Sequence, residues 1–473
     1  MILYDIADTL ARRLEATQNA VEERLFEPTI RLGVTGLSRA GKTVFITSLV
    51  ANLLDRGRMP QLRAVQEGRI TGAFLQPQPD DDVPRFDYET HLAALRGTPP
   101  QWPDSTRTIS QLRLSLRVAP SGILSSLRGP RTIHLDIVDY PGEWLLDLPL
   151  LEQNYAQWCN QTLTRARRPD RADMARDWLA AMDKIDPSQP LDEGQAKTLA
   201  VAFTAYLAAS RAAGFSDCAP GRFLLPGDLD GSPALTFAPL PAPKKARSGS
   251  LYRAFERRFD SYKRVVVKPF FRNHFARIDR QIVLVDALTA IHNGPPAIED
   301  MRQAMANILQ SFRPGKNSWL APILGKRVER ILFAATKADH LHQTQHGKLA
   351  AIMGALVADA QARANHHGAD TSSLAIAALR STVEDTITRN GAAIGAVRGH
   401  LMDRDKSALM YPGTLPEDPA HLLAPARDGQ SDWLDQDFSL MRFAPPKLTL
   451  SPGDGPPHIR LDKALEFLIG DLL

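Results

Sequence analysis

The sequence contains few of the residues that build disulfide-stabilised or metal-dependent proteins. Its 473 residues include only 2 cysteines, Cys159 and Cys218. Their spacing matches neither a redox motif nor a zinc site, so we expect reduced thiols in a cytoplasmic protein. Three histidines cluster at His340, His342 and His346, but no cysteine or carboxylate set accompanies them at metal-binding spacing. A zinc site is therefore not expected.

Long apolar runs are also absent. No segment reaches the 18 or more apolar residues of a membrane-spanning helix. The first 25 residues carry charges throughout, unlike a signal peptide, and their apolar spacing predicts a helix within residues 1–28. The net charge of +4 is small against 57 basic and 53 acidic residues. We expect no nucleic-acid partner, whereas peripheral contact with an anionic membrane remains compatible with this charge.

Apolar strand signals alternate with helical patterns along much of the chain. Strands are expected at 29–35, 109–118, 132–138, 281–288, 329–339 and 373–379, with 109–118 and 132–138 forming a hairpin. Apolar strands separated by helices predict a mostly parallel sheet covered by helices on both faces. Residues 69–104 are rich in proline, aspartate and glycine, which predicts a long exposed loop.

The stretch GLSRAGKT fits the phosphate-binding pattern G-x-x-x-x-G-K-[ST] and stands between a predicted strand and a predicted helix. The glycines let backbone N–H groups turn inward around a phosphate. Lys42 is expected on the β- and γ-phosphates, and Thr43 is expected to give its hydroxyl to Mg²⁺. The residues expected to touch the phosphates are Gly36, Ser38, Arg39, Ala40, Gly41, Lys42, Thr43 and Val44.

A second motif, LDIVDYPGEW, ends an apolar strand with a carboxylate and then a glycine. Asp139 is expected to hold Mg²⁺, usually through water. Gly142 lets its backbone N–H approach the γ-phosphate, where a side chain would block the way. The same residues are also common in ordinary turns. The motif therefore indicates a nucleotide site only in combination with the phosphate loop before it.

A third motif, ATKADH, matches the [NT]KxD element that reads the base in GTPases. Guanine presents N1–H and an exocyclic amine side by side, and one carboxylate accepts both hydrogens. Asp339 is expected to accept both of these hydrogen bonds. Lys337, which follows Thr336, is expected to cover the base with the aliphatic part of its side chain. Adenine has no such pair of donors, so the motif favours GTP and GDP over ATP.

These three motifs, in this order, resemble the translation-factor-like class of P-loop GTPases. That resemblance implies a threonine that completes Mg²⁺ coordination, for which Thr106 and Thr108 are candidates and Thr106 is favoured. It also implies a loop whose backbone touches the guanine, and residues 377–382 occupy that place in a form that departs from the usual Ser-Ala-Lys.

A closer resemblance covers nearly the whole chain from residue 36 onward. GLSRAGKT, LDIVDYPGEWLLDLPLL, LVDALTAIHNGPPAIEDM, ATKADHLH and RLDKALEFLIGDLL together look like the YcjX-like family of bacterial P-loop proteins. The resemblance implies a cytoplasmic, stress-associated nucleotide-binding protein with a GTPase core and a helical insertion.

The expected architecture is therefore an α/β P-loop NTPase of the Ras-like type with two additions. The nucleotide-binding domain comprises residues 29–146 and 278–390, and residues 147–277 form a large helical insertion. Residues 391–473 form a small α+β extension with strand candidates SALMYP, SLMRFAPP and KLTLSP and a closing helix at 461–473. The insertion is also the expected contact for an unknown protein partner.

Catalysis is less well defined by the motifs. Ras-like GTPases place a glutamine after the glycine of the second motif, whereas this chain has Glu143. Glu143 either positions the attacking water or has a structural or switch role. Arg39 either stabilises charge on the phosphates or faces solvent. Three functions remain open: a slow Mg·GTP-hydrolysing switch, a nucleotide-dependent binding module without hydrolysis, and an ATPase.

Residues 252–277 interleave aromatic and basic side chains. This pattern suits contact with acidic phospholipid or nucleic acid, but we favour a helix that returns from the insertion to the core with a solvated basic face.

Overall fold

The computed structural model describes residues 27–37, 39–104, 108–120, 129–311, 328–366, 368–389, 391–404, 406–430, 434, 438–451 and 453–473. The N-terminal helix expected within residues 1–28 lies almost wholly outside them. In the described part of the chain, no helix has both the length and the apolarity needed to cross a membrane.

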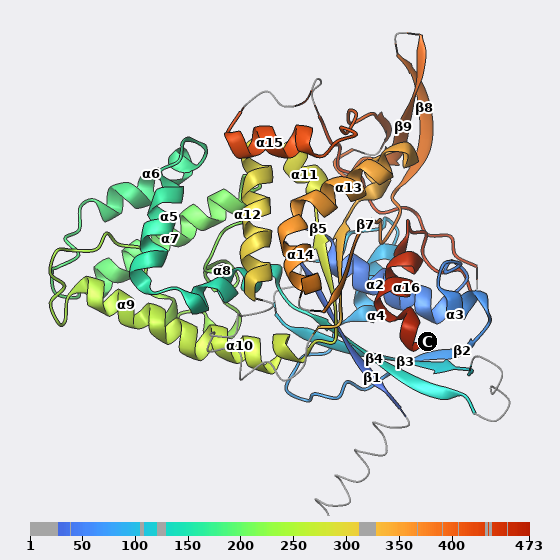
Figure 1. The fold of residues 1–473 in the computed structure, drawn as a ribbon, viewed down its shortest axis with the longest axis horizontal. Helices are drawn as coiled ribbons and strands as arrows, with labels where there is room; N and C mark the ends of the chain where they lie inside the picture. Colours follow the sequence, from blue (N-terminus) through green and yellow to red (C-terminus); the bar gives the residue numbers. More distant parts are fainter. Residues whose placement is uncertain are drawn as a thin grey trace, which may run out of the picture.

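A seven-stranded sheet forms the centre of the molecule, in the order β2-β3-β4-β1-β5-β6-β7 (Figure 1). The run β4-β1-β5-β6-β7 is parallel, and β3 is antiparallel to both β2 and β4. This is the mostly parallel α/β fold that the sequence predicts. The strands are β1 (Thr29–Gly36), β2 (Ile70–Gln76), β3 (Ser110–Val118), β4 (Arg131–Asp139), β5 (Arg280–Val285), β6 (Arg330–Ala335) and β7 (Asp370–Ala375).

Helices cover both faces of this sheet because its central strands are apolar on both sides. In β5, Ile282 and Leu284 belong to one hydrophobic cluster, while Val283 and Val285 belong to the other. The first face packs against α2 (Lys42–Asp55) and α16 (Leu461–Ile469), with α3 (Arg63–Gln66) nearby. The second face packs against α11 (Ala287–His292), α12 (Pro295–Ser311), α13 (His346–Leu356) and α14 (Ala358–His366).

The chain between β4 and β5 is helical throughout its main elements and lies to one side of the sheet (Figure 1). It begins with η2, a 3-10 helix (Gly142–Glu152). The helical region, defined as residues 155–277, follows and contains α5 (Tyr155–Ala166), α6 (Pro169–Met182), α7 (Glu193–Ala212), α8 (Gly221–Leu224), α9 (Leu251–Tyr262), the π-helical turn η5 (Lys263–Val267) and α10 (Lys268–Asn273).

Aromatic packing and one buried ion pair hold the helical region in place. Trp158 stacks on Phe259 with 5.1 Å between ring centroids, which joins α5 to α9. The guanidinium of Arg171 in α6 pairs with the carboxylate of Asp300 in α12, and both side chains are almost completely buried. Because a buried charge without its partner is costly, this pair ties the helical region to the sheet-covering helices.

A second, three-stranded sheet in the order β10-β9-β8 projects from the C-terminal part (Figure 1). It consists of β8 (Thr382–Arg389), β9 (Ala392–His400) and β10 (Ser407–Met410). The domain boundary proposed between residues 390 and 391 therefore falls inside the β8–β9 hairpin. After β10, α15 (Ala420–Asp428) packs against α12, and α16 returns to the central sheet.

Three local predictions are wrong. Residues 69–104 are not one exposed loop: they contain β2 and α4 (Tyr88–Arg96). β2 is not predicted from the sequence because its residues do not alternate cleanly between buried and exposed, and its strand conformation depends on pairing with β3. The stretches SLMRFAPP and KLTLSP form no strand among their described residues, apart from a single bridge between Phe443 and Leu401. Prolines 445 and 446 lack the N–H that a strand ladder requires.

Candidate functional site

The phosphate-loop motif joins the end of β1 to the start of α2. Arg39 and Gly41 adopt left-handed backbone conformations, with φ of 63° and 82°. The ammonium of Lys42 donates to the carbonyl of Gly36 at 3.4 Å, so the lysine folds back over the loop. The N-terminus of α2 points its positive end toward the same place. Ala40 is buried, Arg39 is exposed and Val44 is half-buried, while Ser38 lies outside the described residues.

The hydroxyl of Thr43 is buried and donates to the carbonyl of Asp104 at 3.2 Å. Asp104 directly precedes residues 105–107, which lie outside the described part, so the expected role of Thr106 is not addressed by the geometry. Thr108, the second candidate, is exposed at the start of the approach to β3. The contact brings Thr43 against Asp104, which lies two residues before Thr106 in the sequence.

The first and second motifs touch through their backbones. Asp139 ends β4 beside β1, is 1% exposed and pairs in register with Val34. A methyl group built on Gly142 would lie 1.6 Å from the carbonyl oxygen of Gly36. Only glycine permits this approach, so the structure requires Gly142 for contact with the phosphate loop itself.

Glu143 points into the helical region. Its carboxylate forms an ion pair with Arg211 of α7 at 2.7 Å, and its side chain is 7% exposed. A methyl group on Gly221, at the start of α8, would lie 1.9 Å from the carbonyl oxygen of Glu143. The ion pair engages the carboxylate of Glu143 in this structure, and both roles expected for Glu143 stay predictions.

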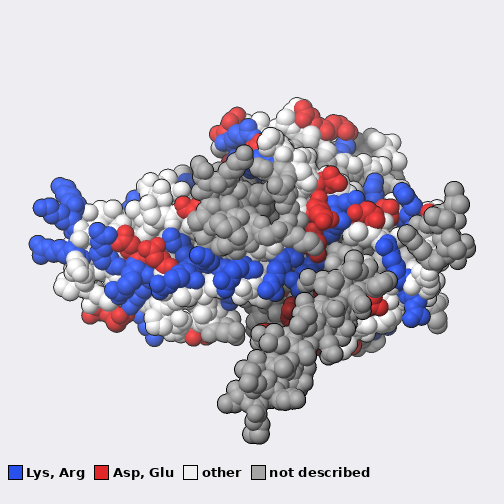
Figure 2. All heavy atoms as spheres, turned by 60° about the horizontal axis from the view of Figure 1, so that its bottom comes forward, with Lys and Arg blue, Asp and Glu red and all other residues white. Residues whose placement is uncertain are grey.

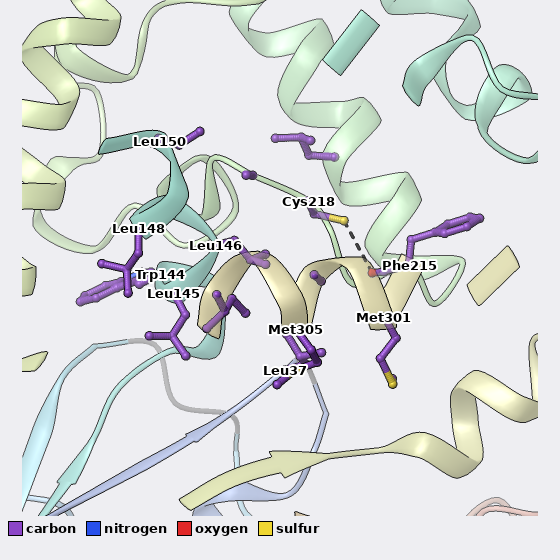
Figure 3. Packing of buried hydrophobic residues seen from close by; sticks show 14 of the residues in the cluster. Leu37, Trp144, Leu145, Leu146, Leu148, Leu150, Phe215, Cys218, Met301 and Met305 are labelled. Carbon is purple, nitrogen blue, oxygen red and sulfur yellow. Dashed lines mark hydrogen bonds between the residues drawn. The ribbon is translucent and has the colours of Figure 1, made fainter. Parts of the chain in front are cut away.

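The rest of η2 is buried between the phosphate loop and the helical region. Figure 3 shows Trp144, Leu145, Leu146 and Leu148 projecting from η2, with Leu37 of the phosphate loop and Met305 of α12 in the same hydrophobic cluster. The guanidinium of Arg222 lies 3.1 Å from the centre of the Trp144 ring. A displacement of η2 therefore disturbs both neighbours.

Asp147 connects η2 to two elements of the helical region. Its carboxylate accepts hydrogen bonds from the Gly221 backbone at 2.7 Å and from the Tyr262 hydroxyl at 2.6 Å. Burial raises the pKa of Asp147 to about 6, although both hydrogen bonds oppose that rise. This carboxyl group thus titrates closer to neutral pH than an exposed aspartate.

The third motif follows β6 at the same carboxyl edge of the sheet. Lys337 adopts a left-handed conformation with φ of 59°, and its ammonium pairs with the carboxylate of Asp286 at the end of β5. Thr336 donates its backbone N–H to the carbonyl of Val285 at 2.9 Å. These contacts fix the loop against the neighbouring strand.

Asp339 is held by the loop at 377–382. One oxygen of its carboxylate accepts from the backbone N–H of Ser381 at 2.8 Å and from the Ser381 hydroxyl at 2.6 Å. The loop expected to touch guanine thus orients the carboxylate expected to read it. Next to Asp339, burial lowers the pKa of His340, whose ring packs edge-on against Phe443 at 5.3 Å.

Several residues in these contacts were not singled out from the sequence, among them Arg211, Asp286 and Ser381. Asp286 had a usable signal, because it ends an apolar strand as Asp139 does. Ser381 stood within the loop already considered, but only its distance to Asp339 reveals its role. Arg211 had no local signal, because its partner Glu143 is far away in the chain.

Comparison with known proteins shows a matching family and similar proteins of nearly the same length. The model of the YcjX-like family, DUF463, matches residues 30–473. A protein of Escherichia coli (strain K12) named Ras-like GTPase YcjX is 40% identical over 479 residues, covering 98% of this chain and 100% of the relative. A protein of Shewanella oneidensis with the same name is 34% identical over 490 residues, covering 98% of this chain and 99% of the relative.

Proposed function

This chain belongs to the YcjX-like family, and we propose on that basis that it binds GTP and GDP with Mg²⁺ and slowly hydrolyses GTP to GDP and phosphate. The observation that carries the proposal is the convergence of three separated motifs on one edge of the sheet. β1, β4 and β6 run parallel, so the residues that follow them meet at the same edge. The names of both relatives, Ras-like GTPase, support the same activity.

In this proposal the phosphates lie over the backbone of residues 36–44. Lys42 binds the β- and γ-phosphate oxygens, and the start of α2 adds its positive dipole. Gly142 has its backbone beside Gly36, where a γ-phosphate can reach its N–H. The loss of the γ-phosphate then changes the position of Gly142 and, through it, of η2.

Thr43 and Asp139 fit Mg²⁺ because both offer hard oxygen atoms at the phosphate end of the site. We propose that Thr106 completes the set and that Thr43 exchanges its present contact with Asp104 for the ion. The bound ion neutralises charge on the phosphate oxygens.

The base is proposed to bind between Lys337 and Asp339. The Asp339 carboxylate accepts from N1–H and the exocyclic amine of guanine, and Ser381 keeps it in that orientation. Asp286 holds the ammonium of Lys337, which leaves the aliphatic stem of the lysine to cover the ring. An adenine nucleotide offers no matching donor pair.

Slow turnover is proposed because no glutamine follows Gly142 and because Glu143 is engaged by Arg211. Arg39 is exposed on the phosphate loop, where it is free to turn toward the phosphates as a charge stabiliser or to face a partner. We further propose that the helical region carries the nucleotide-dependent change to a protein partner and that the protein acts during cellular stress.

Phosphate release from GTP tests the enzyme proposal. Lys42→Ala should reduce release to the uncatalysed background at matched GTP concentration, whereas Lys197→Ala, an exposed lysine of α7, should leave it unchanged. Equal rates for the wild type and Lys42→Ala overturn the enzyme proposal.

Tight GTP binding by a wild-type protein that releases no phosphate supports the second candidate, a nucleotide-dependent binding module. Displacement of labelled GTP by ATP as readily as by GDP supports an ATPase instead.

A further inference from the structure

A strongly basic surface follows α9, η5 and α10. Residues 244–277 contain eleven lysine or arginine residues and two acidic ones, in a chain whose net charge is only +4. The remainder of the chain is therefore acidic on balance. Figure 2 shows the lysine and arginine atoms of this face as a nearly continuous band across the part of the molecule that α9 and α10 occupy.

The band has a regular structural origin. α9, η5 and α10 lie end to end and bury one side, while Arg253, Arg257, Arg264 and Arg272 are exposed on the other and Lys268 is half-buried. We call these five residues the basic stripe. The π-helical turn adds one residue to the helical repeat, so the side chains after it remain on the outer side. At 1.5 Å per residue, the stripe spans about 30 Å.

Internal ion pairs neutralise only part of this charge. Arg253 pairs with Glu256, and outside the stripe Lys263 pairs with Asp260. For Arg257 and Arg264 the structure records no carboxylate partner within the described residues. Val265 lies between Arg264 and Lys268 in the sequence and is 50% exposed, although Tyr262 before it and Val266 after it are buried.

The aromatic residues of the same helices all face inward. None of them is more than 5% exposed, so the described residues of these helices offer no ring on which an unpaired base could stack. The buried rings are Tyr252, Phe255, Phe259, Tyr262, Phe270 and Phe271.

We infer that the basic stripe docks the protein on an anionic phospholipid surface. A plane of lipid headgroups meets all the cations of a straight helix at once, and each basic residue near such a surface adds to the attraction. The exposed Val265 then enters the headgroup layer, where an apolar side chain is more favourable than in water. This binding rests on the outer side of the helices and needs no bound GTP.

Co-sedimentation with vesicles tests the inference on the full-length protein. The wild type should bind vesicles that contain phosphatidylglycerol, should release them as salt is raised, and should not bind vesicles of phosphatidylcholine alone. Arg257→Glu/Arg264→Glu/Arg272→Glu should weaken binding at least about tenfold. The matched control Lys197→Glu/Arg363→Glu/Arg404→Glu, which makes the same charge change at exposed sites elsewhere, should bind within about twofold of the wild type.

A gain of binding distinguishes docking from misfolding. Val265→Trp leaves the net charge unchanged and should tighten binding to the anionic vesicles by about threefold or more. Equal vesicle binding by the stripe variant and its control overturns the inference, and so does an unchanged affinity of Val265→Trp. Stronger binding to RNA, with RNA displacing the vesicles, assigns the surface to nucleic acid instead. Lys42→Ala should bind vesicles normally, which separates this inference from the proposed hydrolysis.

Discussion

The two ends of the proposed nucleotide site are built in different ways. At the phosphate end, the backbones of Gly36 and Gly142 are in contact, and η2 is buried beneath the helical region. At the base end, side chains hold one another: Asp339 is bound by Ser381, and Lys337 by Asp286. A contact between backbones leaves no room for an added atom, whereas a side-chain network can change its specificity when a donor replaces an acceptor. Substitutions at the phosphate end should therefore affect stability and binding more than those at the base end.

Gly142→Ala should have the largest effect. A methyl group 1.6 Å from the Gly36 carbonyl forces the phosphate loop and η2 apart. We expect destabilisation of more than about 3 kcal/mol in denaturant unfolding, together with loss of GTP binding. Gly347→Ala provides the control, because a methyl group there meets no atom within 4 Å. A Gly142→Ala protein that matches the wild type in both measurements contradicts the contact.

Asp339→Asn should change which base is bound while the fold survives. The amide replaces an acceptor with a donor, so GTP affinity should fall by about a hundredfold. Xanthine carries an oxygen where guanine carries its exocyclic amine, and xanthosine triphosphate should bind the variant better than GTP does. Competition binding with both nucleotides measures the exchange. An unchanged preference for GTP removes Asp339 from base recognition.

The ion pair between Glu143 and Arg211 should contribute less than either of these. Because the Arg211 side chain is 28% exposed, we expect a coupling of about 1 kcal/mol in a double-mutant cycle with Glu143→Gln and Arg211→Met. The exposed pair of Arg176 and Asp173 is the matched control and should show almost no coupling. Similar coupling for both pairs would mean that burial of Glu143 adds nothing.

Asp147→Asn should have the smallest effect of all at acidic pH, and its effect should grow as the pH rises. Its pKa rises from an ordinary 3.8 to about 6 on folding. In the window between these two pH values the folded state keeps a proton that the unfolded state releases. Its contribution to the free energy of unfolding is therefore greatest below pH 4 and declines as the pH rises through 6. The wild type should lose stability relative to Asp147→Asn by about 1.4 kcal/mol per pH unit across the window.

Chemical denaturation at about pH 4.5 and about pH 7, on either side of the shifted pKa, measures this difference. Because the amide introduced by Asp147→Asn does not titrate, the other carboxyl groups cancel in the comparison. A stability difference that is the same at both pH values would show that Asp147 is not protonated at the lower one.

The parallel strands and their motifs were predictable because their signals are local. The apolar runs that became β1, β4, β5 and β6 end in the motif residues, and the carboxyl ends of parallel strands share an edge. β2 was missed because its conformation depends on a partner strand. The two strands expected at residues 439–446 and 447–452 did not form, in the part of the chain that the structure describes, beside prolines 445 and 446, which lack backbone donors. The helix expected within residues 1–28 and the roles assigned to the motif residues, Thr106 among them, stay predictions.

The sequence by itself determined the chemistry that the chain can offer: two glycines and a lysine for phosphate, carboxylates at strand ends, and one aspartate with the right motif for guanine. Such patterns are visible because they depend on neighbours within a few positions. Only the tertiary structure decided that Gly142 lies against Gly36, that Glu143 faces Arg211, and that the cations of α9 and α10 form one row. These contacts join residues far apart in the chain, and packing of the helical region against the sheet brings them together.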